Sequence, residues 1–238
     1  MILYMKKINL TVFIGVVGLG ATSLSLHADY PIVSHRYLAD PTSLVTQDRV
    51  YIYCSNDDES PVGGSYNIPN VVCVSSSDMK NWTDHGSVFR AADRTTWAKK
   101  TWAPAAIERD GKFFLYFGNG GANIGVATAP SPVGPFTDPL GKALITHSTP
   151  GVQPATNMWL FDPGAFIDDD GQAYLYFGGN GDNNVRCAKL NRDISASTAR
   201  SSKCTRRTFS RPRGSSRPTA FTTSLIPPRR GRRCGLIT

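Results

Sequence analysis

No acidic residue follows Asp193 in this sequence of 238 residues. The ten Lys and Arg residues between positions 201 and 238 therefore have no acidic partner there, and they more than account for the formal net charge of +8. Over residues 1–200, 18 Asp and Glu slightly outnumber 16 Lys and Arg. The basic composition of the whole chain is thus a property of its tail and argues against nucleic-acid binding by the rest.

The sequence is also poor in cysteine, histidine and helical periodicity. Five Cys are too few for a disulfide-stapled mini-protein and form no Cys-x-x-Cys pair, and the four His show no metal-ligand spacing. No segment keeps a 3.6-residue apolar period, so we expect an all-β fold. Hydrophobic residues make up 40% of the sequence, which is enough for a core and excludes wholesale disorder.

The one long apolar run lies near the N-terminus. Lys6 and Lys7 precede an apolar stretch at 10–19, and small residues follow at 21–23 and at Ala28. The run is short for a bilayer span, so the pattern is typical of a secretory signal peptide over residues 1–28, with a buried first strand as the alternative. We therefore expect a secreted or periplasmic protein with no membrane anchor after cleavage. In an oxidising compartment, Cys54 and Cys73 are candidates for a disulfide.

A pattern with a period near sixty residues occupies residues 29–195. Its repeated prolines are Pro41, Pro104 and Pro163, spaced by 63 and 59 positions, and each is followed by a short apolar stretch, a polar turn and an alternating aromatic strand. Four short strands per unit, repeated radially, are typical of a β-propeller, with a β-sandwich as the alternative. We expect a partial β-propeller catalytic domain with about three blades, fewer than a closed ring requires.

The residue before the repeated proline differs between the units. It is Asp40 in the first and Asp162 in the third, but Ala103 in the second. In a propeller the start of each innermost strand faces the central channel, so these two carboxylates should converge there. Paired carboxylates around a sugar-sized pocket are typical of glycoside hydrolysis. The simpler interpretation is that Asp-Pro merely begins a strand.

Three segments, in their order and spacing, resemble the family 43 glycoside hydrolases. They are ADPTSLVTQDRVYIYCSNDD from Ala39, TWAPAAIERDGKFFLYFGNGG from Thr101 and WLFDPGAFIDDDGQAYLYFGG from Trp159. The resemblance covers about residues 30–193 and implies a five-bladed β-propeller, of which about three blades are present in this chain. It also implies an inverting enzyme of the arabinofuranosidase or β-xylosidase type, which hydrolyses glycosidic bonds in arabinose- and xylose-containing plant polysaccharides.

The same resemblance implies roles for individual residues. Asp40 matches the general base that activates water, and Asp162 matches the carboxylate that raises the pKa of the general acid and orients it. Trp102 resembles an aromatic residue that lines the pocket, with an ordinary core tryptophan as the alternative. The resemblance implies a carbohydrate substrate and no cofactor, and it leaves open a structural calcium ion in the channel.

The family's glutamate general acid has no counterpart after Asp193. We interpret residues 196–238 as a disordered, out-of-frame tail that follows a frameshift after about residue 194, because this explains the arginine richness, the lost periodicity and the missing acids together. On this interpretation the chain is inactive and poorly soluble. The alternatives are a non-catalytic carbohydrate-binding propeller, or a protein that binds nucleic acid through the basic tail.

Overall fold

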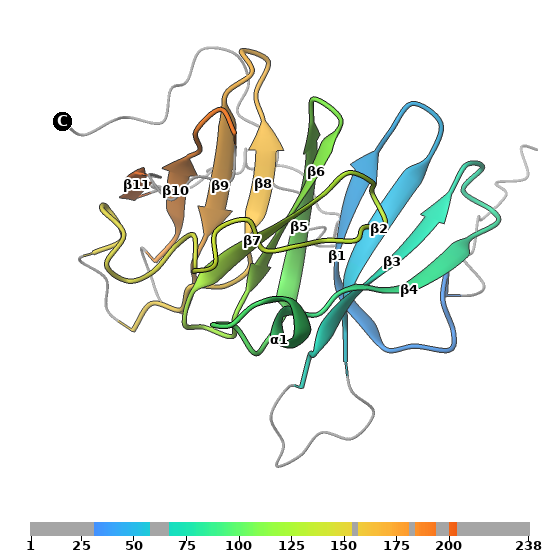
Figure 1. The fold of residues 1–238 in the computed structure, drawn as a ribbon, viewed down its shortest axis with the longest axis horizontal. Helices are drawn as coiled ribbons and strands as arrows, with labels where there is room; N and C mark the ends of the chain where they lie inside the picture. The colour runs from blue at the N-terminus through green and yellow to red at the C-terminus, as the bar shows by residue number, and fades with distance from the viewer. Residues whose placement is uncertain (1–30, 58–66, 154–156, 181–183, 194–199, 204–238) are drawn as a thin grey trace, which may run out of the picture. The chain divides into compact units, whose positions relative to one another are not determined.

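The computed structural model describes residues 31–57, 67–153, 157–180, 184–193 and 200–203 (Figure 1). The expected signal peptide at 1–28 and residues 204–238 of the basic tail lie outside the described residues. All described elements belong to Ile32–Thr238, the larger of two compact units. In the described ranges, no helix is long and apolar enough to cross a membrane.

The first sheet is an antiparallel meander of four strands. Its order is β1-β2-β3-β4, with bounds Leu38–Val45, Val50–Asn56, Asn70–Ser76 and Thr83–Phe89. Exposed and partly buried residues alternate along β1 and β4, whereas β3 is buried at nearly every position. This is the pattern of a sheet whose central strand is covered on both faces. The single helix among the described residues is the short α1, Ala91–Arg94.

The second sheet contains β5 (Trp102–Arg109), β6 (Lys112–Gly118) and β7 (Ile124–Ala129) in that order. Asp110 and Gly111 form the two-residue connection between β5 and β6, at φ 54° and 73°. Positive φ at both positions matches the right-handed twist of the strands, which is why Asp-Gly predicts a tight hairpin. The turn predicted at Asp110-Gly111 is therefore confirmed.

The third sheet has the order β11-β10-β9-β8. Its strands are β8 (Gly164–Ile167), β9 (Ala173–Phe177), β10 (Arg186–Lys189) and β11 (Arg200–Lys203). The strand β11 pairs antiparallel with β10, as the outer strand of a four-stranded unit should. It lies within the tail predicted to be disordered at 196–238, and the described part of that tail, Arg200–Lys203, is a strand.

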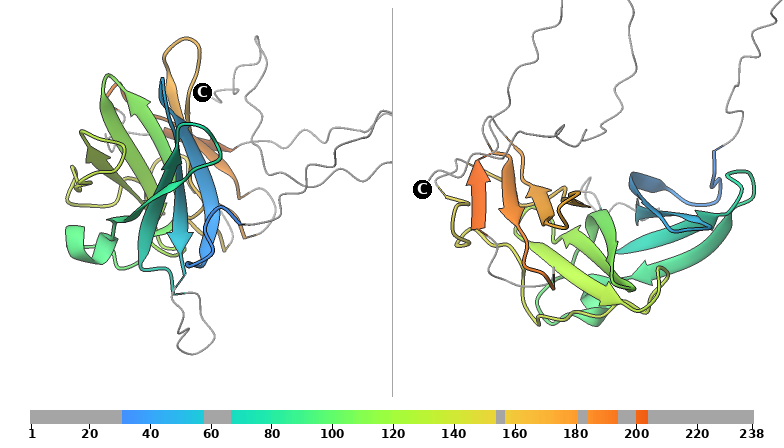
Figure 2. Two further views of the ribbon diagram at one scale, coloured as in Figure 1. Left: turned by 90° about the vertical axis from the view of Figure 1, so that its right-hand side faces the viewer. Right: turned by 90° about the horizontal axis from the view of Figure 1, so that it is seen from above.

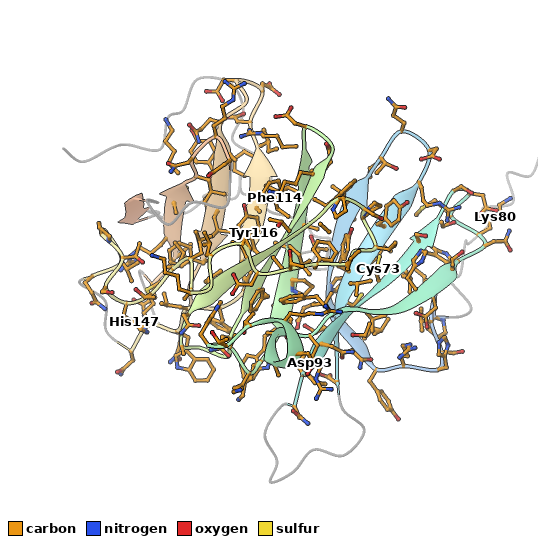
Figure 3. The ribbon with its side chains drawn as sticks, in the orientation of Figure 1. Cys73, Lys80, Asp93, Phe114, Tyr116 and His147 are labelled. Atoms are coloured by element: carbon orange, nitrogen blue, oxygen red, sulfur yellow. The ribbon has the colours of Figure 1, made fainter. Side chains whose placement is uncertain are left out.

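The three sheets adjoin through their first strands. The strand β5 contacts β1 on one side and β8 on the other, and in Figures 1 and 2 the sheets follow one another like blades. One apolar core includes Cys73 on β3 and Leu115 on β6, and a second includes Phe114 and Tyr116 on β6 (Figure 3). Opposite faces of β6 therefore pack in different cores, which joins the blades. The all-β propeller architecture expected from the repeat is confirmed.

Cys54 and Cys73 do not form a disulfide. Both are free thiols and buried. Cys73 pairs in register with Tyr53, whereas Cys54 pairs with Val72. Because neighbouring side chains in a strand point to opposite faces, the two sulfur atoms lie on different sides of the sheet. The disulfide between these two candidate cysteines is therefore absent, and its prediction is wrong. Burial raises the pKa of Cys54 to about 11 and that of Cys73 to about 12.

Candidate active site

The same backbone conformation recurs before each repeated proline. Asp40, Ala103 and Asp162 have φ of 50°, 42° and 49°, in the left-handed region that non-glycine residues rarely adopt. In β1 the register shifts between Ala39 and Thr42, and in β5 it shifts between Trp102 and Ala105. Such bulges change the direction of a side chain at the start of a strand. The three blades thus share a left-handed residue before proline, and in the first two blades a bulge sets the direction of that residue.

Ser55 connects this bulge in the first blade to its equivalent in the second. The Ser55 hydroxyl is fully buried and accepts a hydrogen bond from the Ala103 backbone N–H at 2.9 Å. It donates to Oδ2 of Asp40 at 3.0 Å. Because a hydroxyl has one proton, the N–H of Ala103 orients the Ser55 proton toward Asp40. The carboxylate of Asp40 is therefore held by a residue that is itself fixed by the neighbouring blade.

Asp40 is the common electrostatic neighbour of two other carboxyl groups. The pKa of Asp162 is raised above its ordinary value. The larger cause is that the surrounding protein reduces hydration of the carboxylate, and the second cause is the charge of Asp40. The same two causes, in the same order, raise the pKa of Asp57, which directly follows β2. Asp40 and Asp162 are exposed, whereas Asp57 is partly buried. The fold therefore brings Asp40 and Asp162, from the first and third blades, within electrostatic reach of each other.

Trp102 begins β5, directly before Ala103. It is partly buried, and the Nζ atom of Lys100 lies 4.7 Å from the centre of its ring. Its indole Nε1 is buried and has no hydrogen-bond partner among the described residues. A buried indole N–H usually has a partner, so this donor is unsatisfied in the structure.

A cavity of about 560 Å³ lies near the start of the third blade. Trp159 is 46% exposed there and packs edge-on against Phe161, next to Asp162 in the sequence. The lining residues are Gly121, His147, Asn157, Met158, Trp159 and Asn180; His147 is labelled in Figure 3. An exposed indole among amide and imidazole groups is suited to stacking on a sugar ring.

Ser55, Asp57 and Trp159 were not predicted as site residues from the sequence. A Ser-Asn-Asp segment that ends an apolar strand was the available signal for the first two residues, but their function depends on contacts with distant segments. In the described ranges, no group of three or more His, Cys, Asp or Glu side chains is arranged to hold a metal ion.

The family model for glycosyl hydrolases family 43 matches residues 28–217. This chain belongs to glycosyl hydrolase family 43. The resemblance proposed from the three sequence segments is thereby confirmed, and the match continues past Asp193 into the basic tail.

Several relatives within this family are named for pentose-releasing activities. The chain is 48% identical over 168 residues to an arabinoxylan arabinofuranohydrolase of Paenibacillus polymyxa, covering 63% of this chain and 26% of the relative. It is 46% identical to an arabinoxylan arabinofuranohydrolase of Bacillus subtilis, covering 63% of this chain and 32% of the relative. The family 43 chain thus spans about a quarter to a third of the length of these two relatives.

Solved structures give the same assignment. An α-L-arabinofuranosidase from Clostridium thermocellum superposes with a TM-score of 0.63 at 56% identity, covering 74% of this chain and 60% of that chain. An arabinoxylan arabinofuranohydrolase from Bacillus subtilis, in complex with cellotetraose, gives a TM-score of 0.64 at 40% identity, covering 73% and 42%. The three blades of this family 43 chain therefore correspond to part of each of these proteins.

Proposed function

We propose that this chain carries two of the three catalytic groups of an inverting glycoside hydrolase that acts on arabinose- or xylose-containing plant polysaccharides. The observation that supports this most directly is the shared left-handed backbone of Asp40 and Asp162, two carboxyl-bearing residues supplied by different blades, and the charge of Asp40 also acts on Asp162. Family membership and the names of the relatives support the substrate class.

In this proposal Asp40 is the general base. The hydrogen bond from Ser55 holds Oδ2 of Asp40, so the other carboxylate oxygen is the one to accept a proton from the attacking water. Inversion requires that this water stand between the base and the anomeric carbon, opposite the leaving group. The exposed position of Asp40 leaves water access to that oxygen.

Asp162 orients the general acid and raises its pKa. A negative charge close to a second carboxyl group favours the protonated form of that group, which is the form needed to donate a proton to the leaving oxygen. Trp102 contributes an aromatic wall and an available N–H donor to the sugar-binding pocket.

We further propose that the chain has negligible hydrolytic activity, because the sequence contains no acidic residue after Asp193 to act as the general acid. Loss of a general acid costs typically ~10²–10⁴ in rate. The test is incubation with arabinoxylan and chromatographic detection of free arabinose and xylose. Release that disappears in Asp40→Asn would contradict the proposed inactivity and support the role of Asp40.

The frameshift interpretation has a separate test at the level of the gene. Sequencing across codons 192–238 should show a shifted frame that continues with a glutamate codon straddling Ser210 and Arg211. Expression of the repaired frame should then yield hydrolysis that depends on Asp40 and Asp162. A gene without such a frame would remove this explanation of the basic tail.

We also propose secretion or a periplasmic location, based on the apolar segment at 10–19, and catalysis without a cofactor. Cell fractionation tests the first proposal. Dialysis of the repaired protein against a chelator tests the second, because activity should survive unless a structural calcium ion stabilises the channel.

A non-catalytic carbohydrate-binding propeller is the second candidate. The exposed Trp159, in a cavity with His147, Asn157 and Asn180, favours it specifically, because a stacking platform with amide groups binds sugar without chemistry. The repaired protein separates the candidates, since the enzyme should turn substrate over whereas the binding protein should only retain it. A nucleic-acid-binding tail would instead give salt-dependent DNA binding that disappears when residues 201–238 are removed.

A further inference from the structure

Two buried polar atoms near Asp40 have no hydrogen-bond partner among the described residues. One is Oδ1 of Asp57, which is an acceptor, and the other is Nε1 of Trp102, which is a donor. A buried polar atom without a partner is costly, because it has lost its hydrogen bonds to water. Such atoms are therefore candidates for ligand contacts when they adjoin a substrate site.

The register of the strands places both residues at one edge of the fold. The bond between Ala103 N–H and Ser55 Oγ sets the beginning of β5 beside the end of β2. Trp102 is one residue before Ala103, and Asp57 is two residues after Ser55. The backbone N–H of Asp57 also donates to the carbonyl of Tyr37 at 2.9 Å, which extends the pairing of β1 with β2 by one step.

This extended pairing also indicates the direction of the Asp57 side chain. Residues two positions apart in an extended segment lie on the same face, so Asp57 shares the face of Ser55, whose hydroxyl contacts Asp40. The charge of Asp40 acts on Asp57 and helps to raise its pKa, as expected for side chains on one face. Asp57 therefore faces the same space as the proposed general base.

The chemistry of the two atoms favours a hydroxylated ligand. An acceptor on the segment after β2 and a donor at the start of β5 match sugar hydroxyls, which both donate and accept hydrogen bonds. A cation would satisfy Asp57 but would be repelled by the N–H dipole of Trp102. The adjacent Lys100 ammonium, above the Trp102 ring, also disfavours a cation.

We propose that Asp57 is a specificity-determining residue whose free carboxylate oxygen accepts a hydrogen bond from a hydroxyl of the bound pentose, while Nε1 of Trp102 donates to a sugar oxygen. This inference rests on the proposed function, because it assumes that the space facing Asp40 is the sugar-binding pocket.

The experiment is isothermal titration of the full 238-residue chain with xylotriose that carries an arabinofuranosyl side chain. Binding by the wild-type chain should weaken about 10-fold or more in Asp57→Ala and less in Asp57→Asn, since an amide oxygen still accepts. Trp102→Phe, which keeps a ring but removes the N–H, should also weaken binding. Asp48→Asn is the matched control, because Asp48 is an exposed aspartate in the turn at the opposite end of the β1–β2 hairpin.

A panel of monodeoxy arabinofuranosides then tests direct contact. Removal of one sugar hydroxyl should lower the affinity of the wild-type chain. The same removal should not lower the affinity of Asp57→Ala any further, because the hydroxyl and its acceptor form one interaction that the substitution has already removed. Asp57→Ala should also keep the thermal midpoint of the wild-type chain, since the unpaired oxygen does not stabilise the fold. A purely structural role would lower that midpoint instead and would overturn the inference.

Three further outcomes would count against the proposal in different ways. If the wild-type chain binds no oligosaccharide, the proposed function fails, and this inference fails with it. If the wild-type chain binds and Asp57→Ala binds equally well, only the inference fails. If calcium chloride titrates the wild-type chain and Asp57→Ala abolishes that signal, the occupant is a cation and the inference is wrong.

Discussion

At the scale of single residues, the buried hydroxyl of Ser55 joins two blades and holds the proposed base. We predict that Ser55→Ala lowers the free energy of unfolding by about 1–3 kcal/mol, because it leaves the N–H of Ala103 without its acceptor. Urea unfolding measures this loss. The control is Ser43→Ala on the exposed face of β1, which should change stability by less than about 0.5 kcal/mol. Equal effects of the two substitutions would contradict a bridging role for Ser55.

The interaction of Asp40 with Asp162 predicts a titration effect. In Asp40→Asn the pKa of Asp162 should fall, because a like charge is removed, but it should stay above its ordinary value because the surrounding protein is the larger cause. Carboxyl carbon NMR measures the shift, with Asp48→Asn as a control that leaves Asp162 unchanged. An unaltered pKa of Asp162 in Asp40→Asn would show that the two carboxyl groups do not interact.

The raised pKa of Asp162 also makes its contribution to the stability of the fold depend on pH. A carboxyl group whose pKa is raised in the folded state favours folding when protonated. The contribution of Asp162 is therefore present below its ordinary value of 3.8 and is lost as pH rises through the raised value.

At the scale of elements, the bulge at the start of β5 carries backbone strain at Ala103. Left-handed φ costs a non-glycine residue roughly 1–2 kcal/mol, so Ala103→Gly should be neutral or should stabilise the fold by up to about 1 kcal/mol. Ala106→Gly, at a buried position farther along the same strand, should instead destabilise it by about 1 kcal/mol. Chemical denaturation of both variants is the measurement, and a large loss in Ala103→Gly would contradict the strain.

The segment that precedes β1 is attached to β4 through Asp84. Partial burial raises the pKa of Asp84, but hydrogen bonds from Arg36, Gly86 and His35 outweigh that effect and lower the pKa to about 2. The stabilisation is therefore complete above the ordinary value of 3.8 and is lost as pH falls toward about 2.

Asp84→Asn should accordingly reduce stability at pH 6 by about 1 kcal/mol and flatten the acid-unfolding curve. The comparison variant is Asp93→Asn. Oδ2 of Asp93 lies 3.8 Å from Nε of Arg90, and both side chains are mostly exposed. Loss of this carboxylate should therefore have no measurable effect on the free energy of unfolding. Parallel curves for wild type and Asp84→Asn below pH 4 would contradict the assignment.

At the scale of the whole molecule, apolar packing between blades takes the place of covalent links within the described residues. Cys54 and Cys73 are free and buried. We predict that a thiol reagent leaves these two unlabelled in the folded protein and labels them in urea, because burial raises the pKa of Cys54 and Cys73 and excludes the reagent. Mass-spectrometric peptide mapping is the measurement, and a Cys54–Cys73 linked peptide would contradict it.

The repeat, the strands and the family could be predicted from the sequence, because these depend on local signals such as the Asp-Gly hairpin turn and the spacing of the prolines. The sequence also indicated Asp40 and Asp162, since the same position recurs in the first and third units. Their catalytic roles stay a prediction.

Which side chains meet could not be predicted from the sequence and follows from the three-dimensional fold. The bond from Ala103 to Ser55 joins residues 48 positions apart, and the unpaired oxygen of Asp57 is recognisable only once its surroundings are known. The predicted disulfide failed for the same reason, because the strand register places Cys54 and Cys73 on opposite faces. Hydrogen bonds and burial depend on the packing of blades against each other, which no local pattern encodes.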